Sequence, residues 1–261
     1  NARMSTLADG SNPRMQMFLC GGKDGDYDNG VILHEFGHGV SNRLTGGPQA
    51  VACLGNVEQM GEGWSDFFGM VMTMKPNDVE TTNRTIGTFM FNQNANGAGL
   101  RPYPYTTDMS VNPMTYKTID DPGISRPHGV GAVWATMLWD LNWALIKQYG
   151  WNSDLYNGAY TLDNGVGGNN IALRLVIEGL KIQPCSPGFV DARDAILAAD
   201  LALYGGANRC LIWEVFARRG LGYSADQGST NSRTDGMEGY DMPPACTIEL
   251  LHTVDRRTAY L

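Results

Sequence analysis

The chain has 261 residues, of which 43% are hydrophobic and 18% are charged, and its formal net charge is −8 at pH 7. Its length allows a full core, in one large domain or in two lobes. The acidic balance argues against nucleic acid and anionic membrane as partners, because both attract basic proteins. No run approaches the roughly 18 apolar residues of a membrane span, and Asp140 and Asn142 interrupt the apolar stretch 134–146. We therefore expect a soluble protein.

The cysteines bear on the compartment. They stand singly, without the C-x-x-C spacing of metal sites, as disulfide cysteines of secreted proteins often do: Cys20, Cys53, Cys185, Cys210 and Cys246. We expect a secreted, extracellular protein with two disulfide bonds and one free thiol. Spacing does not give the connectivity, and Cys185 with Cys210 is our working pair. Residues 1–4 lack the apolar core of a signal peptide, and the sequon at Asn83 matters only in a eukaryotic secretory host.

The first elements in chain order are predicted to be short. Residues 1–28 have the composition of extended pieces and loops, and residues 14–19 alternate in hydrophobicity as a strand does. A helix should then begin near Gly30 and end at the Thr45-Gly46-Gly47-Pro48 run. Its apolar side forms a stripe that would face the core: Val31, Leu33, Phe36, Gly37 and Val40.

An acidic run precedes this helix. Asp24, Asp26 and Asp28 fall at positions one, three and five of an EF-hand loop, and position twelve falls on Glu35. An EF-hand needs glycine at position six, where the chain has Asn29, and a helix that starts one residue later would consume the rest of the loop. We expect a solvated turn that caps the helix, with a looser Ca²⁺ site at these aspartates as the alternative.

The helix carries the most informative pattern, His34-Glu35-Phe36-Gly37-His38, which is the HExxH arrangement of zinc hydrolases. Helical residues four apart share a face about one turn apart, so His34 and His38 can bind the same ion. Glu35 flanks that face, where a carboxylate can accept a proton from water. An amphipathic helix with histidines in register by coincidence is the alternative. Half of the four histidines lie in this pentapeptide, which favours one Zn²⁺ ion.

Catalytic zinc usually takes three protein ligands and one water, so a third ligand must come from elsewhere. The segment that starts at Glu58 is predicted to be helical, with Met60, Trp64, Phe67, Phe68 and Val71 as its apolar set. Glu58, Glu62 and Asp66 then line one face at steps of four residues. Spacing alone leaves Glu58 and Glu62 open as ligands, with Asp66 as the acceptor for the second nitrogen of a ligating histidine.

The remainder of the chain is predicted to be mainly helical. Residues 75–127 are rich in Asn, Pro, Gly and Thr, and such a long loop region is usually functional or contains small elements. Further helices are expected at 129–149, 169–183, 189–204 and 208–219. The expected fold class is therefore α+β and predominantly helical, with a few short N-terminal strands.

Six stretches of this sequence look like those of one known family. They occupy residues 12–18, 24–30, 34–47, 61–68, 191–196 and 216–222. Together they resemble the fungalysin family of secreted metalloendopeptidases, which is related to thermolysin in fold. The resemblance implies a thermolysin-like zincin catalytic region over residues 1–261, with edge strands and the HExxH helix in 1–50 and a helical lobe in 51–261.

The resemblance also assigns roles. It implies His34, His38 and Glu62 as zinc ligands, Glu35 as the catalytic carboxylate, and His128 as the residue that stabilises the oxyanion. A lone histidine before a helix is otherwise more often a cap or a core residue. The implied reaction is the hydrolysis of peptide bonds next to apolar residues of proteins or peptides, without an acyl-enzyme.

The chain departs from the family pattern at two places. Thermolysin-like sites commonly have a tyrosine donor between the second histidine and the glutamate ligand, and this segment has none; Tyr103, Tyr105 and Tyr116 are the substitutes considered. Fungalysin catalytic units also begin with a β-rich lobe before the strand that borders the substrate, to which Asn1 and Ala2 would belong here. A separate or missing N-terminal lobe, or an inhibitory propeptide, is thus an expected partner. A zinc aminopeptidase and a non-catalytic metal-binding module without a complete cleft are the alternative functions.

Overall fold

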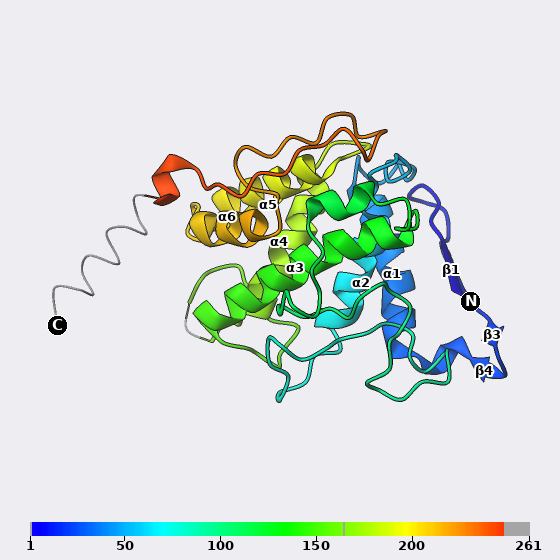
Figure 1. The fold of residues 1–261 in the computed structure, drawn as a ribbon. Helices are drawn as coiled ribbons and strands as arrows, with labels where there is room; N and C mark the ends of the chain where they lie inside the picture. The colour runs from blue at the N-terminus through cyan, green and yellow to red at the C-terminus, as the bar shows by residue number, and fades with distance from the viewer. Residues whose placement is uncertain (1, 164, 248–261) are drawn as a thin grey trace.

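The computed structural model describes residues 2–163 and 165–247. Figure 1 shows short strands at the N-terminal end, followed by helices. The elements are β1 (Ala2–Ser5), β2 (Arg14–Met17), β3 (Leu19–Cys20), β4 (Lys23–Asp24), the 3-10 helix η1 (Gly25–Tyr27), α1 (Asn29–Leu44), α2 (Gly61–Val71), the 3-10 helix η2 (Tyr116–Asp120), α3 (His128–Tyr149), α4 (Gly168–Ile182), α5 (Phe189–Tyr204) and α6 (Arg209–Arg218). The predicted fold class, α+β and mostly helical with short N-terminal strands, is confirmed.

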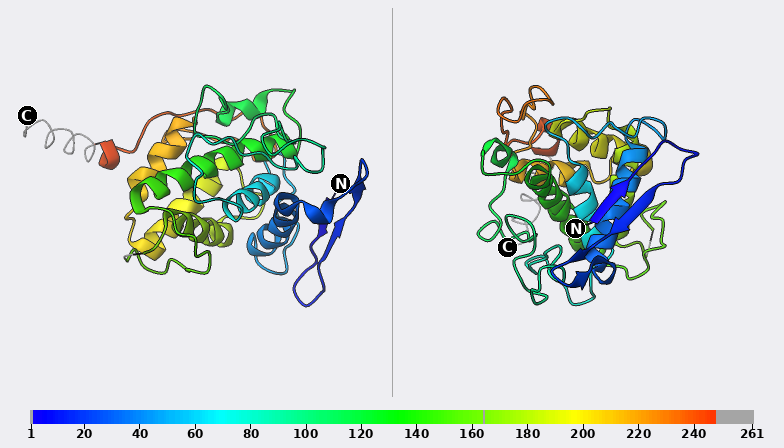
Figure 2. Two further views of the ribbon diagram at one scale, coloured as in Figure 1. Left: turned by 90° about the horizontal axis from the view of Figure 1, so that it is seen from below. Right: turned by 90° about the vertical axis from the view of Figure 1, so that its right-hand side faces the viewer.

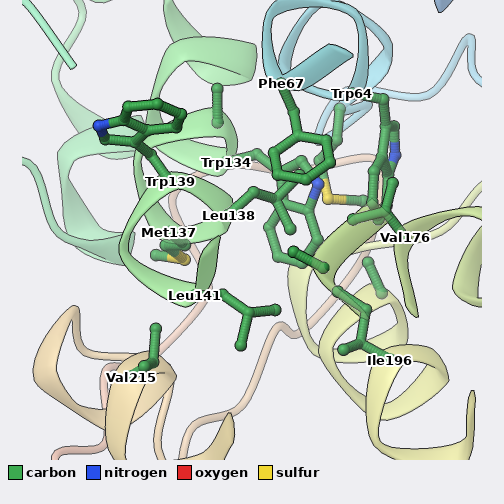
Figure 3. Packing of buried hydrophobic residues seen from close by; sticks show 14 of the residues in the cluster. Trp64, Phe67, Trp134, Met137, Leu138, Trp139, Leu141, Val176, Ile196 and Val215 are labelled. Atoms are coloured by element: carbon green, nitrogen blue, oxygen red, sulfur yellow. The ribbon is translucent and has the colours of Figure 1, made fainter. Parts of the chain in front are cut away.

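Helix α3 lies at the centre of the helical part and contacts α2, α4 and α6. Its residues are apolar almost all round, so nearly the whole helix is buried. Trp134 lies edge-on to Trp64 of α2 and to Phe189 of α5, and it stacks on Phe216 of α6. Figure 3 shows Trp64, Phe67 and Trp134 among aliphatic side chains from neighbouring helices. In the described part of the chain, no helix has both the length and the apolar character needed to cross a membrane.

The strands form a thin layer outside α1. β1 pairs with β2 in an antiparallel register that runs from Ala2 opposite Met17 to Ser5 opposite Arg14, and β3 pairs with β4. Figure 2 shows the β1–β2 pair against α1, on the side away from α3. The predicted strand 14–19 is thus interrupted at Phe18, which lies between β2 and β3.

Two glycines allow α2 and α3 to approach closely. A Cβ atom on Gly63 would lie 2.3 Å from the Gly131 carbonyl oxygen, and one on Gly131 would lie 2.5 Å from Cβ of Glu62. Both distances are shorter than atoms tolerate, so only glycine fits at this crossing. The two helices that carry Glu62 and His128 are in this way brought into contact.

The helix predictions are confirmed, with one correction at Glu58. The four helices predicted at 129–149, 169–183, 189–204 and 208–219 appear within one residue of their expected bounds. α1 starts at Asn29 because Asp28 caps it, accepting a hydrogen bond from the Val31 amide at 3.2 Å. α2, however, begins only at Gly61, so the prediction that Glu58 shares a helical face with Glu62 is wrong. The Glu58 amide instead donates to the Thr230 carbonyl oxygen.

Disulfide bonds join Cys53 to Cys185 and Cys210 to Cys246, and Cys20 is free. The prediction of two bridges and one free thiol is confirmed, but the pair Cys185 with Cys210 is wrong. Cys185 lies in the loop between α4 and α5, beside the segment after α1, where the Ser186 amide donates to the Cys53 carbonyl oxygen. Cys210 lies in the first turn of α6.

A buried ion pair explains the acidic residue that interrupts the apolar run of α3. Nε of Arg219 lies 2.8 Å from Oδ2 of Asp140, and the Arg219 side chain is completely buried. Its Nη1 also donates to the carbonyl oxygens of Asn112 and Met114. This network ties α3 and the end of α6 to the 104–114 segment.

Candidate metal centre

Two helices, α1 and α2, bring the three predicted ligands together. α1 presents His34 and His38, and α2 presents Glu62, whose two carboxylate oxygens lie 3.1 Å from Nε2 of His34 and 3.6 Å from Nε2 of His38. The two Nε2 atoms are 3.1 Å apart. Among the described residues, these three form the only group of His, Cys, Asp and Glu side chains arranged to hold a metal ion.

The donor set fits zinc. Zinc binds histidine nitrogen and carboxylate oxygen at about 2.0–2.2 Å in tetrahedral geometry, which puts two ligand atoms about 3.3–3.5 Å apart. The three observed separations, 3.1, 3.1 and 3.6 Å, bracket that value. Two imidazoles and one carboxylate are also the ligand types of catalytic zinc sites that keep a fourth position for water.

Asp66 orients His34 from behind the site. Oδ1 of this fully buried carboxylate lies 2.7 Å from Nδ1 of His34, so Nδ1 carries the proton and Nε2 keeps its lone pair for the ion. Asp66 is one helical turn after Glu62 on α2, as the spacing predicted for an acceptor. Asp66 is therefore placed to accept a hydrogen bond from a ligating histidine.

The sequence reasoning missed Arg101 and overlooked what Tyr105 contacts. Nε of Arg101 lies 2.6 Å from Oδ2 of Asp66, and its Nη2 lies 2.8 Å from Oδ1 and 3.4 Å from Oε2 of Glu62. The Tyr105 hydroxyl donates to the same Oδ2 atom. Both residues come from the Pro-rich segment 75–127, where no periodic pattern marks functional positions.

The metal centre opens into a cavity of about 710 Å³. Its polar wall contains Glu35, His128 and Arg101 beside the three candidate ligands, and its other walls are mostly apolar: Ala2, Arg3, Met4, Cys20, Val31, Asn42, Ile86, Met90, Phe91, Leu100 and Ser125. Ala2, the first residue of β1, borders the cavity, and Asn1 lies outside the described residues. The candidate ligands, the Glu35 carboxyl group and β1 therefore border one cavity.

Comparison with known proteins agrees with this geometry. Residues 1–225 match the fungalysin metallopeptidase (M36) family. The chain belongs to this family. It is 46% identical over 244 residues to the extracellular metalloproteinase MEP of Fusarium vanettenii, covering 90% of this chain and 37% of that protein. The extracellular metalloproteinase 3 of Trichophyton tonsurans is 42% identical over 254 residues, 94% of this chain and 38% of its own length. The extracellular metalloproteinase mep of Aspergillus niger is 44% identical over 239 residues, 88% of this chain and 37% of its own.

This fungalysin chain thus spans rather more than a third of the length of these relatives. The resemblance inferred from its motifs is confirmed. The relatives' printed names describe extracellular metalloproteinases.

The charges of the fungalysin centre are strongly coupled. Burial lowers the pKa of His34, but hydrogen bonds to Asp66 and Glu62 outweigh it and raise that pKa to about 9. Burial and the neighbouring His34 lower the pKa of His38 to about 4. Burial opposes ionisation of Glu62, yet its bond to His34 lowers its pKa to about 2. The carboxylates of Glu62 and Asp66 thus stabilise positive charge at His34, where a bound cation would take the place of the Nε2 proton.

Glu35 and His128 differ in their surroundings. Glu35 is buried on α1 beside the ligands, and burial raises the pKa of its carboxyl above the ordinary value. A higher pKa makes a carboxylate a better proton acceptor near neutral pH. His128, the first residue of α3, has a side chain 58% exposed, and its Nε2 lies 3.5 Å from Oε1 of Glu62. It stands at the rim of the centre.

The remaining candidates lie elsewhere. Glu58 is fully buried and accepts a hydrogen bond of 2.8 Å from the Tyr116 hydroxyl, and neither residue lines the cavity. Tyr103 borders a separate cavity of about 150 Å³. None of the three tyrosines considered as oxyanion donors therefore reaches the metal centre's cavity.

The acidic run before α1 is engaged in local hydrogen bonds. Oδ1 of Asp24 accepts from the Asp26 amide, and Asp28 caps α1. These aspartates form no metal-binding group with other His, Cys, Asp or Glu side chains of the described chain. The cap predicted as the main reading of this run is present, and α1 begins inside what would be the EF-hand loop.

Proposed function

We propose that this chain is the catalytic region of a secreted zinc-dependent endopeptidase that hydrolyses peptide bonds in protein or peptide substrates. The observation that carries the proposal is the convergence of His34, His38 and Glu62 with Glu35 on one cavity. A structural zinc site has no use for an additional carboxylate beside its ligands, whereas a hydrolytic site needs one. When bound, zinc lowers the pKa of water to about 7 and polarises a carbonyl group.

The side chains have separate tasks in this reaction. Glu35 accepts the proton of the attacking water and then passes it to the leaving amine, as general base and general acid. Its burial, which raises its pKa, suits both steps. Asp66 holds His34 in the tautomer that a metal ligand needs. His128, at the rim, donates a hydrogen bond to the oxygen that becomes negatively charged, a contribution worth about 100- to 1,000-fold in rate.

The cavity walls favour an apolar side chain of an extended peptide. Val31, Ile86, Met90, Phe91 and Leu100 line the space next to the metal centre, and burying apolar surface there stabilises a bound hydrophobic residue. β1 also borders this space. Among the described strands it pairs only with β2, which occupies one of its two edges. An extended peptide would add to the other edge through backbone hydrogen bonds.

The compartment and the partners belong to the same proposal. Two disulfide bonds and the extracellular relatives support secretion. We expect residues 1–50 and 51–261 to fold as one catalytic domain around the cavity between them. The relatives are much longer than this chain, which leaves room for a β-rich lobe or an inhibitory propeptide as a partner.

The aminopeptidase alternative is less well supported. An exopeptidase needs a group that captures the free α-amine of its substrate. Glu58, the carboxylate considered for that task, is buried and bonded to Tyr116 instead of facing the cavity. An endopeptidase should cleave N-blocked and free peptides of the same sequence at similar rates, whereas an aminopeptidase should cleave only the free ones.

Casein digestion by wild type and by Glu35→Gln, each with its zinc content measured, tests the proposal. Gln is isosteric with Glu but cannot accept the proton, so the variant should keep one zinc per chain and lose about 100- to 10,000-fold in rate. Two zinc-loaded proteins that both fail to cleave, or that cleave equally well, would refute it.

A further inference from the structure

Tyr105 contacts the carboxylate that stands behind His34. Its side chain is fully buried, it does not line the cavity, and its hydroxyl donates to Oδ2 of Asp66. Arg101 Nε donates to the same oxygen, while Oδ1 accepts from Arg101 Nη2 and from Nδ1 of His34. Each carboxylate oxygen therefore has two donors, which is the full capacity of an ionised carboxylate.

We propose that Tyr105 is a positioning residue for the metal centre, whose hydroxyl fixes the Asp66 carboxylate so that Oδ1 stays aligned with Nδ1 of His34. The inference rests on the zinc function proposed above. Arg101 alone approaches Asp66 from one direction, with two nitrogens along one edge of the carboxylate. The Tyr105 hydroxyl adds a second direction at Oδ2, so rotation of the carboxylate would break at least one strong bond.

The Tyr105 backbone is itself anchored to the helix that carries Asp66. Its amide donates to the Arg84 carbonyl oxygen at 2.7 Å, and the Arg84 amide donates back at 2.9 Å. The Arg84 guanidinium reaches Oγ1 of Thr73, immediately beyond α2, and pairs with Asp78 at 2.8 Å. The Tyr105 side chain is thus tied to α2 through Asp66, and its backbone through Arg84.

A second buried tyrosine provides a matched control. Tyr116 is 1% exposed, and its hydroxyl donates to Oε1 of Glu58 at 2.8 Å. Tyr105→Phe and Tyr116→Phe each remove one hydroxyl that donates to the oxygen of a buried carboxyl group, and each keeps the ring. Both variants leave a buried carboxyl oxygen without one donor, so the general cost of that loss should appear in both. Only Tyr105 acts on a carboxylate that contacts a candidate metal ligand.

The test is zinc affinity, measured by competition with a chelator, together with the visible spectrum of the Co²⁺-substituted protein. In Tyr105→Phe we expect zinc to bind about tenfold more weakly, as when other partners of a ligating histidine are removed. The Co²⁺ bands should shift, and kcat should fall while KM stays constant. In Tyr116→Phe the affinity and the bands should match the wild type. The thermal midpoint of each metal-free protein reports any general loss of stability.

Two results would overturn the inference alone: a Tyr105→Phe protein with wild-type zinc affinity and spectrum, or equal losses of affinity in both variants. A wild-type protein that takes up no zinc would overturn the proposed function, and this inference with it. Loss of affinity confined to Tyr105→Phe, with a metal-free midpoint similar to that of Tyr116→Phe, is the result that the geometry predicts.

Discussion

His34 is held between two carboxylates of α2, with Nδ1 2.7 Å from Oδ1 of Asp66 and Nε2 3.1 Å from Oε2 of Glu62. The two acids are four residues apart, so one face of α2 meets both nitrogens of a single imidazole. The orientation of the ring is thereby set by one rigid element. The position of the ligand therefore depends on the contact between α1 and α2 more than on any loop.

The identity of the third ligand can be tested with a pair of amide variants. Glu62→Gln removes the charged oxygen next to both histidines and should abolish stoichiometric zinc binding. Glu58→Gln should bind zinc normally, because Glu58 is bonded to Tyr116 and lies outside the metal-binding group. Zinc content after dialysis distinguishes them, and loss of zinc in Glu58→Gln with retention in Glu62→Gln would reverse the assignment.

Glu58 should make stability depend on pH. Burial raises the pKa of its carboxyl to about 8, against the Tyr116 hydrogen bond, which lowers it. The unfolded chain releases this proton near pH 4.3, so between that pH and about 8 the folded state binds more protons and loses stability as the pH rises, by up to about 1.4 kcal/mol per pH unit. Above about pH 8 the loss levels off, because both states are then ionised. Below pH 4 neither state is ionised.

Urea unfolding of wild type and Glu58→Gln at pH 5 and pH 8 measures this effect. The amide imitates the neutral acid. The unfolding free energy of the variant minus that of wild type should therefore be larger at pH 8 than at pH 5. Glu214→Gln, which changes an exposed carboxylate on α6, is the control and should show no such gain. If the unfolding free energies of wild type and Glu58→Gln differ by the same amount at pH 5 and pH 8, Glu58 is not protonated in the folded protein.

Arg219→Leu should be among the most destabilising single changes. It leaves the Asp140 carboxylate buried without its main partner, and breaking a buried pair costs about 3–5 kcal/mol of unfolding free energy. Arg218 also faces Asp140, at 3.5 Å, but its side chain is 46% exposed, so Arg218→Leu should cost less than about 1 kcal/mol. Denaturant unfolding of the two variants gives the comparison, and equal losses would contradict the account.

The two disulfide bonds should contribute unequally. Cys53 and Cys185 are 132 residues apart and Cys210 and Cys246 are 36 apart, so the chain-entropy model assigns them about 5 and about 4 kcal/mol. The double variant Cys53→Ser/Cys185→Ser should therefore unfold at a lower urea concentration than Cys210→Ser/Cys246→Ser. Cys20→Ser, which removes only the free thiol, is the control and should unfold like wild type. The opposite order of the two double variants would show that native contacts, not loop length, decide.

Regular spacing is the reason that much of the centre could be predicted from sequence. His34 and His38 are one turn apart on α1, with Glu35 flanking their face, and Glu62 and Asp66 are one turn apart on α2, so helical geometry alone places each pair on one face. The long helices were equally predictable because their apolar periodicity extends over many residues. Spacing alone could not separate Glu62 from Glu58. The Glu58 amide bonds to the Thr230 carbonyl oxygen, and such a contact with a distant part of the chain leaves no local pattern in the sequence.

The roles of Arg101 and Tyr105 and the disulfide pairing could not be predicted from sequence, for a different reason. Arg101 and Tyr105 reach Asp66 across more than thirty residues of irregular chain, and no periodic rule relates loop residues to a helix face. Cys53 meets Cys185 only because the packing of α4 brings its following loop to the segment after α1. Such contacts are consequences of the assembled fold.

Anomalous diffraction at the zinc absorption edge, with crystals of the zinc-loaded protein, tests the central claim most directly. We predict one strong peak, with Nε2 of His34, Nε2 of His38 and the Glu62 carboxylate as its nearest protein atoms at about 2.0–2.2 Å. A peak held by Glu58 or by the aspartates before α1, or no peak between α1 and α2, would contradict the claim.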